Sequence, residues 1–456
     1  MKTAKYSAYK PSGIEWLGDV PEHWRIDRLK ASIVSCRNGI WGDEAQGDEN
    51  DIPCVRVADF DRQKLRVELD EPTIRSVTGK ERSGRLLSKG DLLLEKSGGG
   101  ENQPVGCVVL YDDARPAVCS NFVARVVVAN DQHSSYWRYV HAAAYAVRLT
   151  VGSINQTSGI QNLDQARYFN EYVAFPPPTE QAAIAAFLDR ETAKIDALVE
   201  EQKRLIELLK EKRQAVISQA VTKGLDQSVP MKDSGVECLG EVPAHWQVRP
   251  LKKCIAFQEG PGIMAADFQD DGVPLLRISC VQSEAVTLAG CNYLDPDKVA
   301  RQWSHFRVEI GDLLISGSAS MGVVSEVGEE AEGAVPYTGL MRLQSRHGGM
   351  LKDFIKHLVV SDSFMRQVQL LKTGSTIQHF GPTHLNHMLV VLPPEDEQEA
   401  IATFLTSENR RMDSLRAEAE AGMALLEERR SALISAAVTG KIDVRGLAPQ
   451  PEVTAA

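Results

Sequence analysis

The same motifs occur twice in this sequence, in the same order. Residues 12–24 read SGIEWLGDVPEHW and residues 234–246 read SGVECLGEVPAHW, with nine of thirteen positions identical. A second block, EQAAIAAFL at 180–188, returns as EQEAIATFL at 397–405. A repeat of this length is too long for a solenoid or propeller unit. The repetition therefore predicts two domains of one fold, related by a pseudo-two-fold axis, whose divergent central parts read two different things.

Composition narrows the class of protein. The 456 residues are 43% hydrophobic and 25% charged, as is ordinary for a soluble globular protein. The sequence contains no apolar run suited to a signal peptide or a membrane span, and its eight cysteines form no CxxC pair. We therefore expect a cytoplasmic protein with reduced thiols, no membrane contact, no metal and no cofactor. The net charge of −11 is unfavourable for a nucleic-acid binder but does not exclude one, because acidic residues can occupy other faces.

Proline-rich segments divide the chain. FPPP at 175–178 and LPP at 392–394 each precede a segment of helical periodicity. We expect a first globular domain over 1–178, a first helix over 179–224, a second globular domain over 225–395 and a second helix over 396–441. Residues 442–456 are expected to form a disordered tail. The predicted class is α+β: two similar mixed α/β domains separated by two long helices.

The two long segments carry apolar residues at alternating spacings of four and three, the pattern of a coiled coil. An antiparallel register sets Leu205 against Leu415 and Leu198 against Gly422. It also sets Glu191 against Arg429 and Lys212 against Glu408, so that opposite charges meet. A parallel pair would instead oppose like charges, which favours the antiparallel arrangement. The alternative is two amphipathic helices, each packed on its own domain.

These repeated motifs resemble the specificity subunit of a type I restriction-modification enzyme. The resemblance runs from Tyr9 to about Asp443. Paired GDLL segments (90–93 and 311–314), two Gly-Ser elements (152–163 and 374–385) and the helix ends ISQAVTKG and ISAAVTGK follow the openings in the same order. The resemblance implies that each globular region is a target recognition domain for half of a split double-stranded DNA sequence. It also implies two methylation subunits on the helices, with restriction subunits joining that core.

Candidate DNA contacts are the small and polar residues of the Gly-Ser elements and of the loop KSGGGENQ (96–103), where the backbone can approach closely and polar side chains can reach phosphates or base edges. Gln156, Gln378 and His379 are the main candidates for base readout; the alternative is a turn residue bonded to its own backbone. The full predicted set is Lys96, Ser97, Gly98, Asn102, Gln156, Thr157, Ser158, Gln161, Ser316, Ser318, Ser375, Thr376, Gln378 and His379.

Candidate partner contacts lie at the helix starts. Phe187 and Phe404 flank the predicted seam at equivalent positions, which suggests two copies of one partner; packing on the neighbouring globular domain is the alternative. The predicted set is Glu180, Gln181, Phe187, Glu397, Gln398 and Phe404.

Catalytic motifs find little support. SGGG at 97–100 lacks the GK[ST] of a phosphate-binding loop, and the chain has no NPPY-type run such as adenine methyltransferases carry. His23 and His245 recur in proline-led turns before tryptophan, which favours a structural role. We therefore expect a non-catalytic subunit. The alternative function is a coiled-coil scaffold that binds no DNA and carries two peptide-binding modules.

Overall fold

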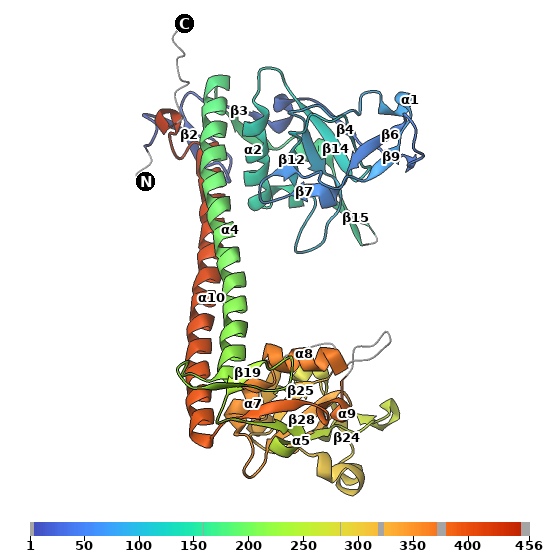
Figure 1. Ribbon diagram of the computed structural model, residues 1–456. Helices are drawn as coiled ribbons and strands as arrows, with labels where there is room; N and C mark the ends of the chain where they lie inside the picture. The colour runs from blue at the N-terminus through green and yellow to red at the C-terminus, as the bar shows by residue number, and fades with distance from the viewer. Residues whose placement is uncertain (1–3, 158, 283, 318–322, 372–379, 448–456) are drawn as a thin grey trace. The chain divides into compact units, whose positions relative to one another are not determined.

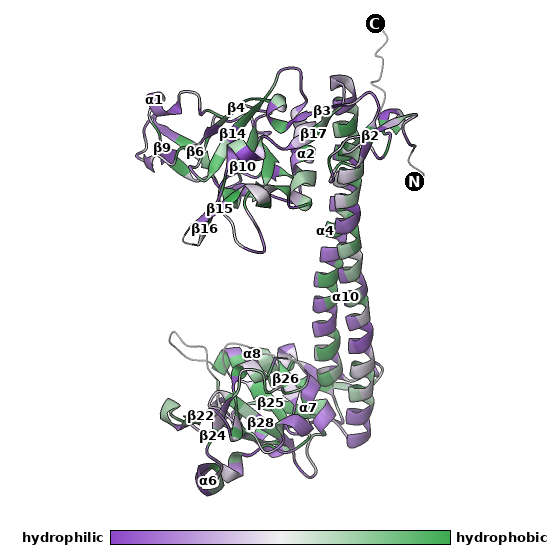
Figure 2. Ribbon diagram, turned by 180° about the vertical axis from the view of Figure 1, so that it is seen from behind, coloured by the Kyte–Doolittle hydropathy of each residue, from purple (hydrophilic) through white to green (hydrophobic). Residues whose placement is uncertain are grey.

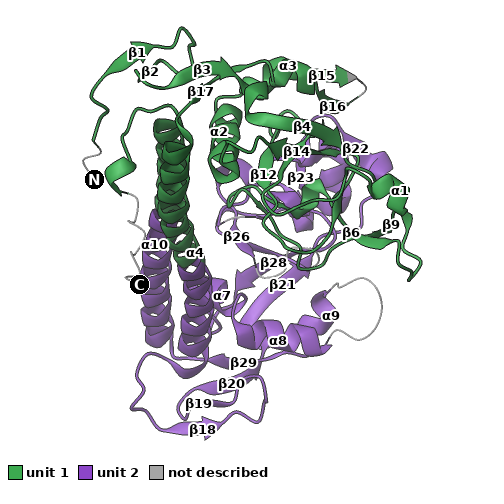
Figure 3. Ribbon diagram, turned by 90° about the horizontal axis from the view of Figure 1, so that it is seen from above, with its two compact units in different colours: residues 1–203, 420–456 green, residues 204–419 purple. Residues whose placement is uncertain are grey.

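The computed structural model describes residues 4–157, 159–282, 284–317, 323–371 and 380–447. The chain forms two compact units (Figure 3): unit 1 comprises Met1–Lys203 and Glu420–Ala456, and unit 2 comprises Arg204–Ala419. Each unit therefore contains one globular region together with part of each long helix, α4 (Pro178–Lys223) and α10 (Glu395–Val438). Among the described residues, no helix is both long and apolar enough to cross a membrane.

Unit 1 is built on a six-stranded mixed sheet whose strands β10 and β14 are almost wholly buried. Side chains alternate along β10: Leu92 and Leu94 join the core under helix α2 (Ser134–Ala146), and Leu93 joins a second core on the opposite face. The sheet order is β4 (Ile33–Asn38), β14 (Val123–Val128), β10 (Leu92–Glu95), β12 (Val108–Leu110), β8 (Arg66–Val67) and β7 (Phe60–Asp61).

Unit 1 also contains a four-stranded and a three-stranded sheet. One has the order β13 (Val118–Cys119), β6 (Asp51–Val55), β9 (Ile74–Ser76) and β5 (Asp43–Glu44). The other has the order β11 (Ser97–Gly98), β16 (Ile160–Leu163) and β15 (Ile154–Thr157).

Unit 2 also has a main sheet and a second sheet, but their strands and strand orders differ from those of unit 1. Its main sheet has the order β21 (Ile255–Glu259), β28 (Leu340–Ser345), β25 (Leu313–Ser316) and β26 (Val324–Glu326). The inner strands β25 and β28 are largely hydrophobic (Figure 2). Helices α7 (Lys352–Leu358) and α8 (Asp362–Leu371) contribute to the same core. A second sheet has the order β22 (Phe268–Gln269), β24 (Asn292–Leu294), β23 (Val273–Leu276) and β27 (Val335–Pro336).

The repeated openings form equivalent structures. Residues 9–21 make the hairpin of β1 (Tyr9–Pro11) and β2 (Asp19–Pro21), and residues 231–243 make that of β18 (Met231–Asp233) and β19 (Glu241–Pro243). The glycine after each long helix touches the tryptophan that closes an opening. A Cβ on Gly440 would lie 3.2 Å from Trp24, and one on Gly224 would lie 3.1 Å from Trp246. Both glycines have positive φ, as expected just past a helix C-terminus.

Within each unit the two long helices pack against each other (Figure 1). In unit 1, Ile184 and Leu188 near the start of α4 share a buried cluster with Ile434 and Val438 near the end of α10. In unit 2, Ile217 and Val221 near the end of α4 share a cluster with Ile401 and Leu405 near the start of α10. In each unit the start of one helix therefore meets the end of the other.

The predicted seam is wrong at several positions. Leu198, Leu205 and Leu415 are 44%, 40% and 39% exposed, whereas Val199 and Ile206 are buried. The predicted cross-helix pairs are replaced as well. Glu191 pairs with Arg190 and Lys194 of its own helix, and Glu408 with Arg411 of its own helix. The cross-helix ion pairs are instead Asp196–Arg430 in unit 1 and Arg213–Asp413 in unit 2.

The predicted disordered tail begins too early, because residues 442–447 pack on unit 1. Ala4 and Asp443 form a β-bridge, and Val444 is fully buried. The Arg445 guanidinium lies 4.9 Å from the centre of the Tyr6 ring, and Arg190 donates a hydrogen bond to the Leu447 carbonyl oxygen over 2.8 Å. Residues 448–456 lie outside the described part of the chain.

Candidate nucleic-acid interface

The sheet β11–β16–β15 brings together candidate residues that are far apart in the sequence. Strand β11 carries Ser97 and Gly98, and it pairs with β16 so that Gly98 lies opposite Gln161. On the other side of β16, Gln156 of β15 also lies opposite Gln161. The β15–β16 hairpin projects from the body of unit 1 (Figure 1). A two-stranded ribbon of this kind fits the major groove of DNA.

Two of these candidates hold the sheet together. The Ser97 hydroxyl donates to the Asn162 amide oxygen over 2.6 Å, which ties β11 to β16. The Gln161 amide oxygen accepts a hydrogen bond from the Val105 backbone N–H over 3.2 Å. Both side chains are 8% exposed. They therefore position the sheet and the loop that follows β11, rather than presenting polar groups to solvent.

Gln156 and Asn102 remain available at the surface. Gln156 is exposed on the projecting hairpin, and Asn102 is exposed in the loop between β11 and β12. Lys96 is half-buried between β10 and β11, and Gly98 has a φ of +113°, a conformation that favours glycine. Gln156 also lines a cavity of about 410 Å³ together with Arg148 and Gln161.

The remaining candidates are not part of this surface. Ser316 ends β25 and is 1% exposed, so its side chain belongs to the interior of unit 2. For Thr157 the backbone is described but the side chain is not. The other predicted residues lie outside the described part of the chain: Ser158, Ser318, Ser375, Thr376, Gln378 and His379.

Sequence reasoning missed two surface aromatics beside this sheet. Trp41 and Phe122 are 39% and 43% exposed, and both line a cavity of about 450 Å³ together with Ser97 and Gly98. The available signal was Trp41 itself, an aromatic residue in the polar, glycine-flanked run NGIWGDE. Nothing in the sequence indicates that Phe122 lies near it, because their approach depends on strand pairing between distant segments.

The predicted partner residues Glu180 and Glu397 make equivalent internal contacts. Glu180 is 5% exposed and accepts hydrogen bonds from the Tyr6 hydroxyl over 2.5 Å and from Trp24 Nε1 over 3.1 Å. Glu397 accepts from Trp246 Nε1 over 2.9 Å. Each carboxylate also contacts the histidine before its tryptophan, at 2.8 Å in unit 1 and 2.6 Å in unit 2. Burial, followed by the hydrogen bond to Glu180, raises the pKa of Tyr6.

Gln181 and Gln398 also have one structural role in two places. The Gln181 amide oxygen accepts from the His133 backbone N–H, and its Nε2 donates to the Pro176 carbonyl oxygen, each over 3.0 Å. The Gln398 amide oxygen accepts from the Leu351 N–H over 2.8 Å, and its Nε2 donates to the Pro393 carbonyl oxygen over 3.0 Å. These contacts fasten each helix start to its own globular region.

Phe187 and Phe404 differ despite their equivalent positions. Phe187 is 1% exposed and belongs to the unit 1 core, whereas Phe404 is 40% exposed. The described contacts of Phe187, Glu180, Gln181, Glu397 and Gln398 are therefore internal to their units. A partner-binding role stays a prediction for Phe404 and for Glu397, whose side chain is 36% exposed.

Comparisons with known proteins support the resemblance that the repeated motifs indicate. No family model matches the sequence. The MjaVIII specificity subunit of a type I restriction enzyme from Methanocaldococcus jannaschii is 25% identical over 297 residues, which are 64% of this chain and 66% of that protein. The putative MjaX specificity subunit from the same organism is 21% identical over 445 residues, 94% of this chain and 96% of that protein. Over most of its length this chain is similar to type I restriction specificity subunits.

Solved structures show the same fold. A chain from a study of complex assembly and conformational transition in the type I R-M system has a TM-score of 0.65 at 16% identity, covering 92% of this chain and 98% of that chain. The HsdS subunit from Thermoanaerobacter tengcongensis has a TM-score of 0.52 at 15% identity, covering 93% and 98%. At these identities the likeness establishes the fold of this chain and not its residue roles.

Proposed function

We propose that this specificity subunit recognises an asymmetric, bipartite double-stranded DNA target in the cytoplasm and directs methylation and cleavage by partner subunits. The observation that carries the proposal is the projecting β15–β16 hairpin, whose exposed Gln156 stands on a sheet that also gathers Ser97 and Gly98. A ribbon with a polar side chain suits readout of base edges, and a glycine allows close backbone approach. The chain itself supplies no catalytic group in this proposal.

The difference between the two globular regions supports an asymmetric target. The frames repeat, since the equivalent pairs Glu180–Trp24 and Glu397–Trp246 anchor them both. The inserted sheets differ: among the described residues, the main sheet has six strands in unit 1 and four in unit 2. Two globular regions that share their anchoring contacts but differ in their sheets suit the recognition of two different half-sequences.

The long helices are proposed to form an antiparallel coiled coil that relates the two repeats by a pseudo-two-fold axis and sets the gap between half-sites. Its partners would be two methylation subunits, with restriction subunits joining through that complex. Paired ends of α4 and α10 within each unit support this arrangement. The relatives that the chain resembles are named as subunits of type I restriction enzymes, which supports the choice of partners.

The helices are tested as a ruler by inserting seven residues after Gln202 and seven after Ala419. Each insertion adds about 10 Å at 1.5 Å per residue, roughly three base pairs. Mapping methylated bases in the genome of cells that carry the complex should show the same two half-sites set farther apart. The matched control adds the same seven residues after Ala456 and should leave the spacing unchanged. A folded, active insertion variant with unchanged spacing would refute the ruler.

Recognition itself is tested with Gln156→Ala, using Gln46→Ala as control because Gln46 is also an exposed glutamine of unit 1. In complex with methylation subunits, Gln156→Ala should lose about tenfold or more in affinity for the mapped target, the discrimination expected of one base contact. The control should bind normally. If the wild-type complex shows no preference for any duplex sequence, the non-DNA scaffold becomes the better reading.

A further inference from the structure

A cavity of about 450 Å³ opens beside the candidate DNA-reading sheet of unit 1. Ser97 and Gly98 belong both to its lining and to strand β11 of that sheet. The two half-exposed aromatics, Trp41 and Phe122, and the apolar side chain of Val57 supply much of the remaining wall. The cavity thus has an apolar wall, which is accompanied by the polar residues Arg56, Glu95, Ser97, Ser120 and Asn121, and it is continuous with the surface proposed to meet DNA.

Trp41 is held in place while partly exposed. The Arg75 guanidinium lies 4.6 Å from the centre of its ring. Arg75 also donates hydrogen bonds to the backbone carbonyl oxygen of Trp41 over 3.2 Å and to that of Gly42 over 3.0 Å. One arginine therefore fixes both the ring and the backbone that carries it, which limits the entropy lost when a ligand binds.

Phe122 is fixed from the other side. Its backbone carbonyl oxygen accepts hydrogen bonds from the N–H groups of Lys96 over 2.9 Å and Ser97 over 3.2 Å. The segment that carries Phe122 is therefore tied to the same residues that begin strand β11. A large apolar side chain left half-exposed on a fixed backbone contributes little to the core, and apolar groups gathered in this way mark binding surfaces.

The charge of the cavity suits nucleic acid. Glu95 is 2% exposed and lines the cavity, but its carboxylate pairs with the Arg62 guanidinium over 2.8 Å. Burial raises the pKa of Glu95, and Arg62 opposes this rise. Arg56 also lines the cavity and pairs with the Asp59 carboxylate over 2.9 Å, while the Arg75 guanidinium lies over the Trp41 ring. An anionic duplex would therefore meet a buried acid paired with arginine, a second arginine–carboxylate pair and the positive charge of Arg75.

The second repeat lacks the aromatic walls. Gly39 and Gly260 are equivalent, because a Cβ on either would collide with the carbonyl oxygens of equivalent residues, Cys119 in unit 1 and Pro336 in unit 2. Counted from these anchors, the positions of Trp41 and Phe122 are occupied by Gly262 and Gly339. The frame is thus retained while both aromatics are specific to unit 1, as expected of side chains that read only one half-site.

We propose that this cavity receives the 5-methyl edge of a thymine in the half-site read by unit 1. The inference rests on the proposed DNA recognition and names a chemical determinant within it. Thymine is the base that presents an apolar group in the major groove, and phenylalanine is among the side chains that contact it. The apolar wall of Trp41, Phe122 and Val57 matches that methyl group, and the Ser97 backbone strand lies alongside.

The test uses the complex with methylation subunits and a duplex that carries the mapped target. Each thymine of both half-sites is replaced in turn by uracil, which removes only the methyl group. We expect about a fourfold loss of affinity, the worth of one buried methyl group, at a thymine of one half-site. The other half-site should be insensitive at every thymine.

The variant Trp41→Ala with Phe122→Ala should bind thymine and uracil duplexes equally. Tyr172→Ala is the matched control, because Tyr172 is an aromatic of unit 1 that is 41% exposed and lies on β17 (Tyr172–Phe175), outside the cavity. The control should keep the fourfold discrimination. Assembly with methylation subunits, measured by native mass spectrometry, should be unchanged in all three proteins.

Several outcomes overturn the inference. They are half-sites without thymine, uracil tolerated at every position, or discrimination that survives in the double variant. Loss of subunit assembly in the double variant alone would assign the cavity to an apolar side chain of a partner. A wild-type complex with no sequence preference would instead refute the proposed function itself, and with it this inference.

Discussion

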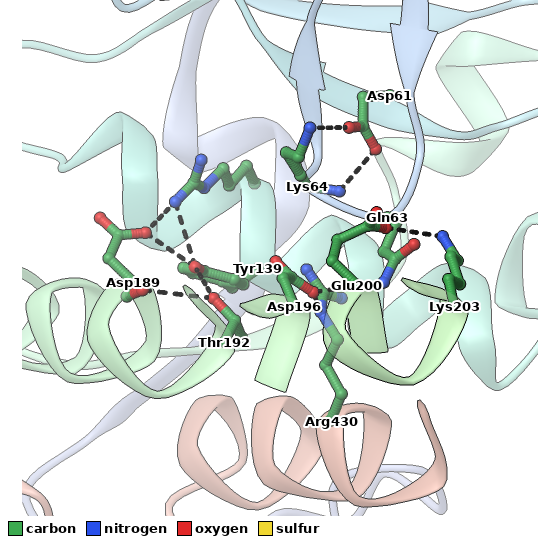
Figure 4. A network of polar contacts seen from close by, with 11 residues as sticks. Asp61, Gln63, Lys64, Tyr139, Asp189, Thr192, Asp196, Glu200, Lys203 and Arg430 are labelled. Atoms are coloured by element: carbon green, nitrogen blue, oxygen red, sulfur yellow. Dashed lines mark hydrogen bonds and ion pairs between the residues drawn. The ribbon is translucent and has the colours of Figure 1, made fainter. Parts of the chain in front are cut away.

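Two ion pairs that are equivalent in the repeat lie in different environments. In unit 1, Arg430 Nε lies 3.3 Å from Asp196 Oδ1, and the two side chains are 11% and 16% exposed. Figure 4 shows Asp196, Arg430 and Gln63 in one polar network, in which Gln63 Nε2 donates to Asp196 Oδ1 over 3.4 Å. In unit 2, Arg213 and Asp413 occupy the equivalent positions. Arg213 Nη2 lies 2.5 Å from Asp413 Oδ1, but the two side chains are 31% and 42% exposed. The two pairs therefore differ in burial, and also in hydrogen bonding, because only Arg213 donates a hydrogen bond to its aspartate.

The substitution Asp196→Asn should destabilise the packing of α4 on α10 in unit 1 strongly. It leaves the Arg430 charge nearly buried without a counter-charge, which costs about 3–5 kcal/mol in buried pairs. The lower end, about 3 kcal/mol, is expected because the 3.3 Å contact is an ion pair without hydrogen-bond alignment. The matched control Asp413→Asn breaks a pair that solvent already screens and should cost about 1 kcal/mol or less.

The assay is native-state hydrogen exchange of the full chain, read on peptides of α4 and α10 within each unit. The double variant Asp196→Asn with Arg430→Met should recover most of the loss, because no unpaired charge remains. Equal costs for Asp196→Asn and Asp413→Asn would refute the burial argument. A double variant as unstable as Asp196→Asn would show that packing, and not charge, accounts for the loss.

Two further predictions follow from burial. His141 is 1% exposed, and burial lowers its pKa from 6.5 to about 3, so the folded state excludes a proton that the unfolded state binds below pH 6.5. His141 should therefore contribute a loss of stability of about 2 kcal/mol between pH 7.5 and 5, at 1.36 kcal/mol per pH unit below 6.5. His141→Gln should reduce the pH dependence by this amount in urea unfolding followed by tryptophan fluorescence, and an unchanged slope would contradict it. Phe404→Ala should change stability by less than about 0.5 kcal/mol yet weaken co-purification with methylation subunits, whereas Phe187→Ala should cost about 3–5 kcal/mol in thermal unfolding. Intact assembly of Phe404→Ala would end the interface reading.

The repeated motifs were informative because they contain both partners of a contact that recurs in each unit. Glu180 and Trp24, like Glu397 and Trp246, are joined by one hydrogen bond whose partners stand in the quoted blocks. The seam was less predictable. Leu198 is followed by Val199 and Leu205 by Ile206, so apolar spacing alone fits two faces about 100° apart. Burial selects Val199 and Ile206, because the globular region and the second helix together decide which face is covered.

The candidate DNA contacts could be named from the sequence only where they are close together in it. The Gly-Ser element at 152–163 contains the β15–β16 hairpin, and the predicted loop 96–103 contains β11, but the pairing of these strands was not predicted. Trp41 and Phe122 converge through the pairing of β4 with β14 and of β6 with β13, contacts between segments distant in the chain. No local pattern records such pairing, so the cavity is visible only in the fold.

The contrast between Phe187 and Phe404 has a cause in the segments that follow the helices. Arg190 lies over the Phe187 ring, 5.6 Å from its centre, and donates to the Leu447 carbonyl oxygen, while Val444 joins the same buried cluster. At the equivalent positions after α4 the chain has Gln227 and Pro230 in place of Val444 and Leu447. The apolar cover of Phe187 therefore has no counterpart of the same chemistry for Phe404. If two copies of one partner bind, one copy meets the exposed Phe404 in unit 2, and the other meets unit 1, where Phe187 is buried. Equal affinity at both places would then require contacts outside these two residues.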